Sequence, residues 1–431
     1  MLIEFRVENH RSIRDEQGLT LEAGPVDGDT TRLRAVDGRQ LLPAAALYGA
    51  NASGKSNVLA ALRFMRDAVA NSHSFWQLDG GVPREPFAWG RMRREMSLFQ
   101  TQFLIDDVRY EYGFVVDDVR IREEWLKAWP HGRPQVWFER DSPGRPMKFG
   151  EHLRGENRAV ELLTRENALF LSAAAQLNHE QLAPIFRWFQ GMHSVGVRSR
   201  NPSILVEKPV RWFAGDASPT FGEGGKGAER IAGFRDLLRA ADIGIIDLEV
   251  TDGNDGRGRR VLVRHQARTE DAWLPLEEES HGTQRLFSLA PLVFHALAEG
   301  AVLLVDELEA GLHPLLALEI VRAFHDPKRN PKGAQLIFTT HDTNLLGSLV
   351  GEPALRRDQV WLTEKDDDGG TRFYPMTDYK PRKMENLERG YLQGRYGAIP
   401  FLGVLPWGDA PVEPPRPAIA ATPPRKKAKK R

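Results

Sequence analysis

The sequence contains no cysteine among its 431 residues. Disulfide frameworks, thiolate sites for zinc or iron–sulfur clusters, and a cysteine nucleophile are therefore excluded. The chain also lacks any run of 18 or more apolar residues, and its first fifteen residues carry charges every few positions where a signal peptide would be apolar. We therefore expect a soluble protein of the reducing cytoplasm that does not enter a membrane.

Net charge is lacking as well, because 59 basic residues balance 59 acidic ones. The balance is uneven along the chain. Residues 411–431 contain seven basic residues, six prolines and one acid, which leaves 52 basic and 58 acidic residues for the rest. Such a segment buries too little apolar surface to fold, so residues 404–431 are predicted to be a disordered basic tail. It is either a solvated extension or a contact for nucleic-acid phosphates and acidic partners.

Strand and helix patterns alternate at both ends of the chain, which is typical of an α/β fold. Residues 2–7 alternate in polarity, and residues 41–49 form an apolar strand that enters a glycine turn and a helix. Short β-rich runs at 97–139 predict an antiparallel meander. Residues 157–195 change to helical spacing without sustained heptads, so we expect a helical insert and no long coiled coil. Its predicted apolar anchors are Leu162, Leu163, Leu169, Leu177, Leu182, Ile185, Phe186 and Phe189.

The sequence GANASGKS at residues 49–56 matches the phosphate-loop pattern G-x-x-x-x-G-K-[ST] between an apolar strand and a helix. In such a loop, backbone amides face the phosphates, Lys55 reaches the β and γ oxygens, and the Ser56 hydroxyl ligates Mg²⁺. A plain glycine-rich turn is the alternative. The residues expected to hold the nucleotide, ATP, are Gly49, Asn51, Ser53, Gly54, Lys55, Ser56 and Asn57.

Two acids, Asp306 and Glu307, follow the apolar run 302–305. A buried strand would deliver them to the carboxyl edge of the sheet, where open α/β folds bind ligands. After a phosphate loop, this position predicts that Asp306 holds Mg²⁺ and that Glu307 orients and deprotonates water, although an acid pair alone is often only a turn. His341 ends the apolar strand QLIFTT and is expected beside the pair, where a lone histidine is more often structural.

The segment Ser280-His-Gly-Thr-Gln lies where a helix is predicted to begin, near Thr283. A serine and a glycine at a helix N-terminus form a second anion site, which the chain's own phosphate loop does not need. Ser280, Gly282 and Thr283 are therefore candidate binding residues. The alternative is an ordinary helix cap, since Ser and Thr are preferred at that position.

These elements, in this order, resemble the ABC-type ATPases: phosphate loop, signature at 280–284, acid pair, a D-loop-like segment at 309–313 and the His341 switch. The resemblance implies that two heads close around two ATP molecules. Ser280 and Gly282 would contact the γ-phosphate held by the partner head, and His341 would also contact γ-phosphate.

The sequence departs from the pattern of the ABC-type ATPases in two places. The signature differs from LSGGQ, with Glu279 before the serine and His281 inside it. The glutamine of the family's Q-loop has no clear counterpart, and Gln100 and Gln102 are its candidates.

The beginning FRVENHRSI is similar to the SMC and RecF branch, with His10 replacing the usual aromatic residue. Residues 163–189, 279–297, 306–314 and 391–402 resemble bacterial AAA-type ATP-binding proteins of the RloA and AbiL kind, relatives of OLD nucleases and of the AriA-like ATPase of PARIS. The resemblance implies an α/β ABC-type ATPase head with a mixed sheet, a β meander and a helical insert in place of a coiled coil.

The expected domains follow this resemblance. Residues 1–150 form the N-terminal half of the core with the phosphate loop and meander, and 151–240 form the helical insert or lid. Residues 241–403 form the C-terminal half with the signature, acid pair and His341.

RloA-like proteins are associated with abortive anti-phage defence and act with a separately encoded effector. The resemblance thus implies an ATP-hydrolysing sensor and scaffold, a homodimer or higher oligomer, that holds an effector such as a Toprim nuclease. Only 90 residues follow His341, and their acids at 366–368 precede two glycines and predict a hairpin turn. A RecF-like DNA-maintenance ATPase and a non-hydrolysing ATP switch are the alternatives, and the acidic body argues against the first.

Overall fold

The computed structural model describes residues 1–24, 30–36, 38–141, 144–197, 209–215, 227–241, 244–252, 259–269, 272–348, 352–380 and 385–400. The predicted basic tail, 404–431, lies outside these residues. The strands are β1 Leu2–Glu8, β2 Gln17–Thr20, β3 Arg34–Val36, β4 Arg39–Leu41, β5 Ala44–Gly49, β6 Ser97–Ile105, β7 Val108–Val116, β8 Ile121–Trp129, β9 Gln135–Arg140, β10 Lys148–Phe149, β11 His193–Val195, β12 Ile245–Asp252, β13 Arg259–His265, β14 Trp273–Pro275, β15 Val302–Val305, β16 Gln335–Thr339, β17 Val360–Lys365 and β18 Thr371–Pro375. The α-helices are α1 Lys55–Asn71, α2 Asn157–Leu163, α3 Phe170–Gln176, α4 Ala183–Gln190, α5 Pro209–Ala214, α6 Gly227–Ala240, α7 His281–Glu299, α8 Pro314–His325 and α9 Leu387–Leu392.

A six-stranded mixed sheet forms the centre, in the order β11-β15-β16-β5-β17-β18. All neighbours are parallel except β17 and β18. Strands β5, β15 and β16 are fully buried, which explains their unbroken apolar sequences. Because these strands are parallel, their carboxyl ends meet at one edge of the sheet, and the loops that follow them lie together.

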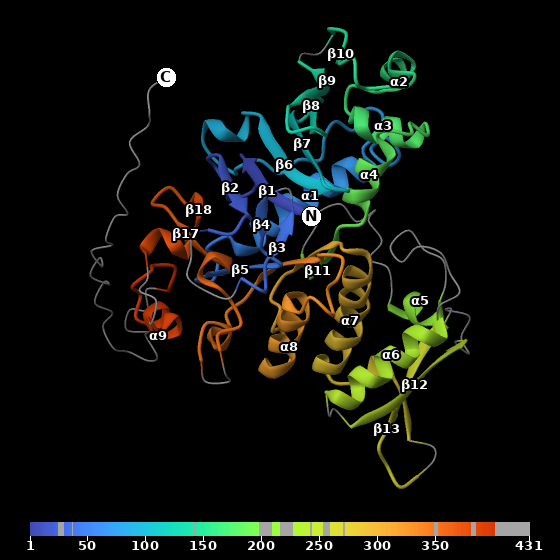
Figure 1. Ribbon diagram of the computed structural model, residues 1–431, viewed down its shortest axis with the longest axis vertical. Coiled ribbons are helices and arrows are strands. Elements are labelled where there is room, and N and C mark those ends of the chain that lie inside the picture. Colours follow the sequence, from blue (N-terminus) through green and yellow to red (C-terminus); the bar gives the residue numbers. More distant parts are fainter. Residues whose placement is uncertain are drawn as a thin grey trace.

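A seven-stranded antiparallel sheet covers one side of this centre, in the order β10-β9-β8-β7-β6-β1-β2 (Figure 1). Apolar side chains of both sheets and of α1, such as Phe99, Leu59 and Leu47, share one core. Alternate residues of the parallel strands, such as Tyr48 and Leu303, face a second core with α7 and α8. The predicted α/β fold with an antiparallel meander is thus confirmed, and two cores sandwich the central sheet.

The range predicted as a helical insert differs from expectation in two ways. It contains β11, which pairs in parallel with β15 and forms the edge of the central sheet. Three of the predicted apolar anchors are also exposed, Leu162 by 86%, Leu163 by 58% and Leu177 by 42%. In helices this short, helical spacing does not show which side is buried. Neighbouring elements cover only one side of each helix, so apolar residues on the other side stay exposed. The remaining anchors are buried in the first core.

A smaller unit packs on α7. It contains α5, α6 and a three-stranded antiparallel sheet, β12-β13-β14. Aromatic rings join it to α7, with centroid distances of 4.6 Å between Phe234 and Phe287 and 5.7 Å between Phe213 and Phe287. In the part of the chain that the structure describes, no helix has the length and apolar character needed to cross a bilayer.

Candidate nucleotide-binding site

The loop between β5 and α1 is pressed closely against the last two strands of the sheet. At Gly54 the φ angle is 108°, a conformation that side chains disfavour, and a Cβ there would collide with the Thr371 side chain. A Cβ on Gly49 would lie 2.7 Å from Ser53 Oγ and 2.5 Å from the carbonyl oxygen of Thr363. Both glycines of the motif are thus required by close packing within the chain.

A network of short hydrogen bonds joins this loop to other segments of the chain. Ser53 Oγ lies 2.6 Å from Thr363 Oγ1, and Thr371 Oγ1 donates to the Ser53 carbonyl at 2.8 Å. Ser12 Oγ lies 2.7 Å from Thr371 Oγ1 and accepts from Asn57 Nδ2 at 2.6 Å. The side chains of Ser53 and Asn57 therefore hold the loop in place. These partners were not predicted, because Thr363 and Thr371 are 310 and 318 positions from Ser53 and Ser12 is 45 positions from Asn57.

Lys55 occupies the centre of the loop and is buried. Its Nζ donates to the carbonyl oxygens of Gly49 at 2.8 Å and Ala50 at 3.0 Å. Burial lowers the pKa of Lys55, and the nearby carboxylates of Asp306 and Glu307 oppose that shift. The ammonium group thus bonds to the loop, and the charges of the acid pair act on it.

The acid pair follows β15 and is joined to the phosphate loop by direct hydrogen bonds. Ser56 Oγ donates to Asp306 Oδ1 at 2.9 Å, and Thr339 Oγ1 donates to the same oxygen at 2.7 Å. The backbone N–H of Glu307 donates to Thr339 Oγ1 at 2.7 Å. A hydroxyl and a carboxylate oxygen so close together fit the oxygen ligands that Mg²⁺ prefers, so Ser56 and Asp306 could hold that ion. Thr339, at the end of β16, was not predicted.

The backbone of Glu307 is in the left-handed region, with φ of 52°, which is uncommon for a residue other than glycine. Arg285, from α7, donates through Nη2 to the carbonyl oxygens of Asp306 at 3.0 Å and Glu307 at 3.3 Å. Thr339 binds the N–H of Glu307 from the other side. This clamp leaves the Glu307 side chain exposed at the sheet edge. Arg285 was also missed, and its position directly after the signature glutamine was the available signal.

His341 lies at the same edge, after β16. Its backbone N–H donates to Glu309 Oε1 at 2.6 Å, and its side chain is exposed. Partial burial and the charge of Lys55 lower the pKa of His341, against the effect of Glu309 and the acid pair. The net shift favours the neutral form of the imidazole. The structure thus brings together the phosphate loop, Asp306, Glu307 and His341.

The signature segment forms the N-terminus of α7, which begins at His281 rather than near Thr283. Ser280 is the N-cap: its Oγ accepts from Thr283 N at 3.2 Å and lies 3.0 Å from Thr283 Oγ1. Ser280 is exposed. Among the described residues no hydrogen bond links it to the chain's own phosphate loop. Gly282 packs against the carbonyl of Gly311, where any side chain would collide.

The two Q-loop candidates lie on β6, which pairs with β1. Gln100 is opposite Arg6, and Gln102 is opposite Glu4. Gln102 Nε2 approaches Glu111 Oε2 at 3.4 Å. In the described part of the chain neither glutamine is hydrogen-bonded to the phosphate loop, and the assignment stays a prediction.

His10 replaces an aromatic residue in the resemblance, and it packs like one. It is buried, with its ring centroid 5.7 Å from that of Phe64 and 5.5 Å from that of Phe99. Burial lowers the pKa of His10 to about 3. Both ring nitrogens lack partners among the described residues. The ring is therefore a neutral part of the core beneath α1.

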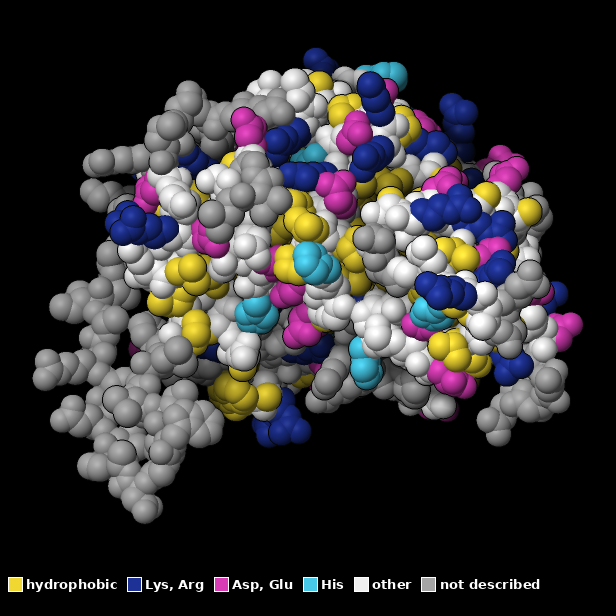
Figure 2. All heavy atoms as spheres, turned by 90° about the horizontal axis from the view of Figure 1, so that it is seen from below, with side chains coloured by type: hydrophobic (Ala, Val, Ile, Leu, Met, Phe, Trp, Pro, Cys, Tyr) yellow, Lys and Arg dark blue, Asp and Glu magenta, His cyan; other side chains and the backbone are white. Residues whose placement is uncertain are grey.

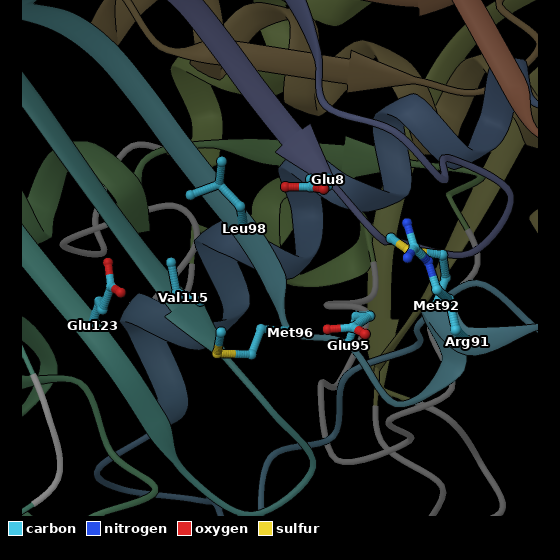
Figure 3. A pocket seen from close by; sticks show the side chains of 8 residues that line it. All are labelled: Glu8, Arg91, Met92, Glu95, Met96, Leu98, Val115 and Glu123. Atoms are coloured by element: carbon cyan, nitrogen blue, oxygen red, sulfur yellow. The ribbon is translucent and has the colours of Figure 1, made fainter.

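A groove of about 450 Å³ lies on the antiparallel sheet, apart from these residues (Figure 3). A row of paired residues across four strands contributes Glu8, Leu98, Val115 and Glu123. The segment before β6 completes the lining with Arg91, Met92, Glu95 and Met96. None of these residues belongs to the phosphate loop, the acid pair or the signature.

One comparison with known proteins identifies the family of the chain. Residues 44–347 match the family described as "AAA domain, putative AbiEii toxin, Type IV TA system". This match covers more than half of the chain and includes every element from β5 to His341. The chain belongs to this family.

Solved structures of SMC heads are also similar. The SMC head domain from Thermotoga maritima has 15% identity and a TM-score of 0.39, covering 87% of this chain and 98% of that one. The Pyrococcus furiosus Smc head bound to the C-terminal domain of ScpA has 12% identity and a TM-score of 0.40, covering 91% and 98%. A search of curated proteins found no match.

Proposed function

We propose that this protein binds ATP with Mg²⁺ at residues 49–57 and hydrolyses it at the carboxyl edge of the central sheet. One observation carries the proposal: hydrogen bonds link Ser56, Asp306, Thr339 and Glu307 without a break. These bonds support the proposal because they hold Ser56, Asp306 and the backbone of Glu307 in place relative to the phosphate loop. Membership in an AAA domain family supports the same chemistry.

Each residue has a task that its surroundings allow. Lys55, now bonded to loop carbonyls, is the cation for the β- and γ-phosphates. Ser56 and Asp306 would hold Mg²⁺, which supplies charge neutralisation on the phosphate oxygens. Glu307 is exposed, so its carboxylate can orient and deprotonate a water molecule. His341 is exposed at the same edge, so its imidazole N–H can donate a hydrogen bond to a γ-phosphate oxygen.

The active unit is a dimer of heads or a higher oligomer. Ser280 caps the 19-residue helix α7, is exposed, and bonds only within its own turn among the described residues. A helix N-terminus with this geometry favours an anion. The anion we propose is the γ-phosphate of ATP bound to a second copy, with Ser280 and Gly282 as its contacts.

In the cell, we propose an ATP-dependent sensor and scaffold of an anti-phage system, which acts with a separately encoded effector such as a Toprim nuclease. The family description, which names a toxin of a toxin–antitoxin system, supports a defence role. Hydrophobic, basic and acidic side chains are interspersed on the face seen from below, among the residues that the structure describes (Figure 2). This mixture differs from the basic face that duplex binding requires. The basic tail is a candidate for nucleic-acid contact.

The test compares the purified parent protein with Glu307→Gln. The variant should retain ATP binding and lose about two to four decades of hydrolysis, the usual contribution of a general base. The parent should cleave neither plasmid, single-stranded DNA nor transfer RNA, with or without ATP. Parent-level hydrolysis by Glu307→Gln would contradict the assignment of the base. If the parent cleaves nucleic acid and a point mutation in this chain abolishes the cleavage, the protein is a self-contained nuclease and the scaffold proposal is wrong.

A further inference from the structure

Glu309 lies two residues beyond Glu307, and its carboxylate accepts the backbone N–H of His341. The distance from that nitrogen to Glu309 Oε1 is 2.6 Å, which is short for a bond from a backbone N–H. The second oxygen, Oε2, is buried and has no hydrogen-bond partner among the described residues. A buried carboxylate oxygen without a partner is unfavourable, so stability alone does not account for this side chain.

The backbone around Glu309 is anchored independently of His341. Leu308 N donates to the Thr339 carbonyl at 3.0 Å, and the Leu308 side chain is fully buried. Ala310 N donates to the Glu307 carbonyl at 3.0 Å, and Leu312 N donates to the Glu309 carbonyl at 2.9 Å. Glu309 thus projects from a fixed turn.

His341, in contrast, depends on Glu309. The residues on either side have other anchors: Thr340 N donates to the Leu47 carbonyl at 3.1 Å, and Tyr48 Oη donates to the Asp342 carbonyl at 2.9 Å. The N–H of His341 donates to Glu309. The orientation of this peptide unit sets the direction of the Cα–Cβ bond, which carries the exposed imidazole.

We propose that Glu309 is a positioning residue for ATP hydrolysis, which holds the peptide of His341 and therefore aims the imidazole at the γ-phosphate. The inference rests on the proposed function, and it adds a residue to that site. Glu309 differs from Glu307, whose carboxylate is exposed and whose backbone is the part that is clamped. The contribution of Glu309 is the hydrogen bond to the amide, not its charge.

Two substitutions separate the hydrogen bond from the charge. Glu309→Gln keeps an acceptor oxygen at the same reach, so kcat should stay within about threefold of the parent. Glu309→Leu keeps similar bulk without an acceptor, so kcat should fall by about 10- to 100-fold, as a misplaced group at a reacting centre does. ATP affinity should change less than about threefold in both, because Lys55 and Ser56 are untouched. Glu180→Leu, at an exposed glutamate between α3 and α4, is the matched control.

A double-mutant cycle tests whether Glu309 acts through His341. In a His341→Ala background, Glu309→Leu should cause no further loss of kcat. Losses that multiply would overturn the inference. The inference would also be overturned if kcat of Glu309→Gln fell as far as kcat of Glu309→Leu, because the charge of Glu309 would then be the important property.

Amide hydrogen exchange provides a readout that needs no hydrolysis. Exchange in a peptide covering 338–346 should speed up in Glu309→Leu and stay at the parent rate in Glu309→Gln and Glu180→Leu. Unchanged exchange in Glu309→Leu would overturn the inference even if the parent is an active ATPase. A parent that hydrolyses no ATP would instead overturn the proposed function, and the exchange rates would still decide whether Glu309 holds His341.

Discussion

Two helix N-termini in this molecule are suited to anions, and they are built differently. The start of α1 is enclosed by its own chain: Ser12, Thr363, Thr371 and Asp306 all bond to the loop or first turn. The start of α7 presents Ser280 to solvent, and among the described residues its hydroxyl bonds only to Thr283. For the first, we expect residues of one head to bind ATP. The second has the geometry of half a site, which a second molecule would complete.

The largest effect should come from breaking the enclosed site. Lys55→Ala removes the only cation of the phosphate-loop motif, so ATP affinity should fall by more than about 100-fold, given the strength of charge-assisted bonds to phosphate. Titration calorimetry with ATP and Mg²⁺ measures this loss. Lys328→Ala, at an exposed lysine, is the control. Affinity within about fivefold of the parent would show that the enclosed helix start is not the ATP site.

The exposed site should respond in the opposite way. Ser280→Arg should leave ATP affinity almost unchanged and lower kcat by about 10- to 100-fold, because a donor to the transition state is replaced by a bulky group. ATP-dependent association, measured by sizing under turnover conditions, should fall as well. Mixing Ser280→Arg with Lys55→Ala protein should restore part of the activity through one intact composite site. Turnover by a strictly monomeric parent would contradict the dimer.

A smaller effect should follow from loosening the link between the phosphate loop and the acid pair. Thr339→Val removes a donor to Asp306 and the acceptor for the Glu307 amide at nearly constant volume. We expect a loss of about tenfold in kcat and a higher Mg²⁺ requirement, consistent with about 1 kcal/mol per hydrogen bond. Thr339→Ser should restore most of the activity. If Thr339→Val titrates with Mg²⁺ like the parent, the threonine does not orient Asp306.

The last effect concerns stability, away from both sites. The folded-state pKa of His10 is about 3, below its ordinary value of 6.5, so the unfolded chain binds a proton that the folded chain excludes. The contribution of His10 to the free energy of unfolding is therefore fully present above pH 6.5. It falls as the pH drops from 6.5 towards 3, by up to about 1.4 kcal/mol per pH unit. His10→Phe should flatten this dependence and add about 1 kcal/mol at pH 7, because two unpartnered buried nitrogens disappear. Denaturant unfolding at pH 5 and pH 7 measures both changes, and an unaltered pH dependence would contradict them.

Local patterns were sufficient for the elements that carry the enclosed site. The apolar runs ending at Gly49 and Val305 are buried parallel strands, and the meander at 97–139 is antiparallel. Local sequence patterns did not predict which side of an element is buried where that burial depends on elements distant in sequence. Leu162 and Leu163 lie on a helix with one buried residue, and 193–195 form a strand only because β15 offers an edge.

The sequence by itself determined the α/β class, the phosphate loop and the acid pair, because strand burial and the chemistry of phosphate binding leave local traces in residue type and spacing. Only the tertiary structure revealed that Thr339 joins Asp306 to Glu307, that Arg285 clamps the backbone after β15, and that Glu309 holds His341. These contacts join residues between 21 and 33 positions apart, or side chains to backbone. Such contacts depend on which strands become neighbours in the sheet. The residue pattern of a single segment does not indicate the order of the strands.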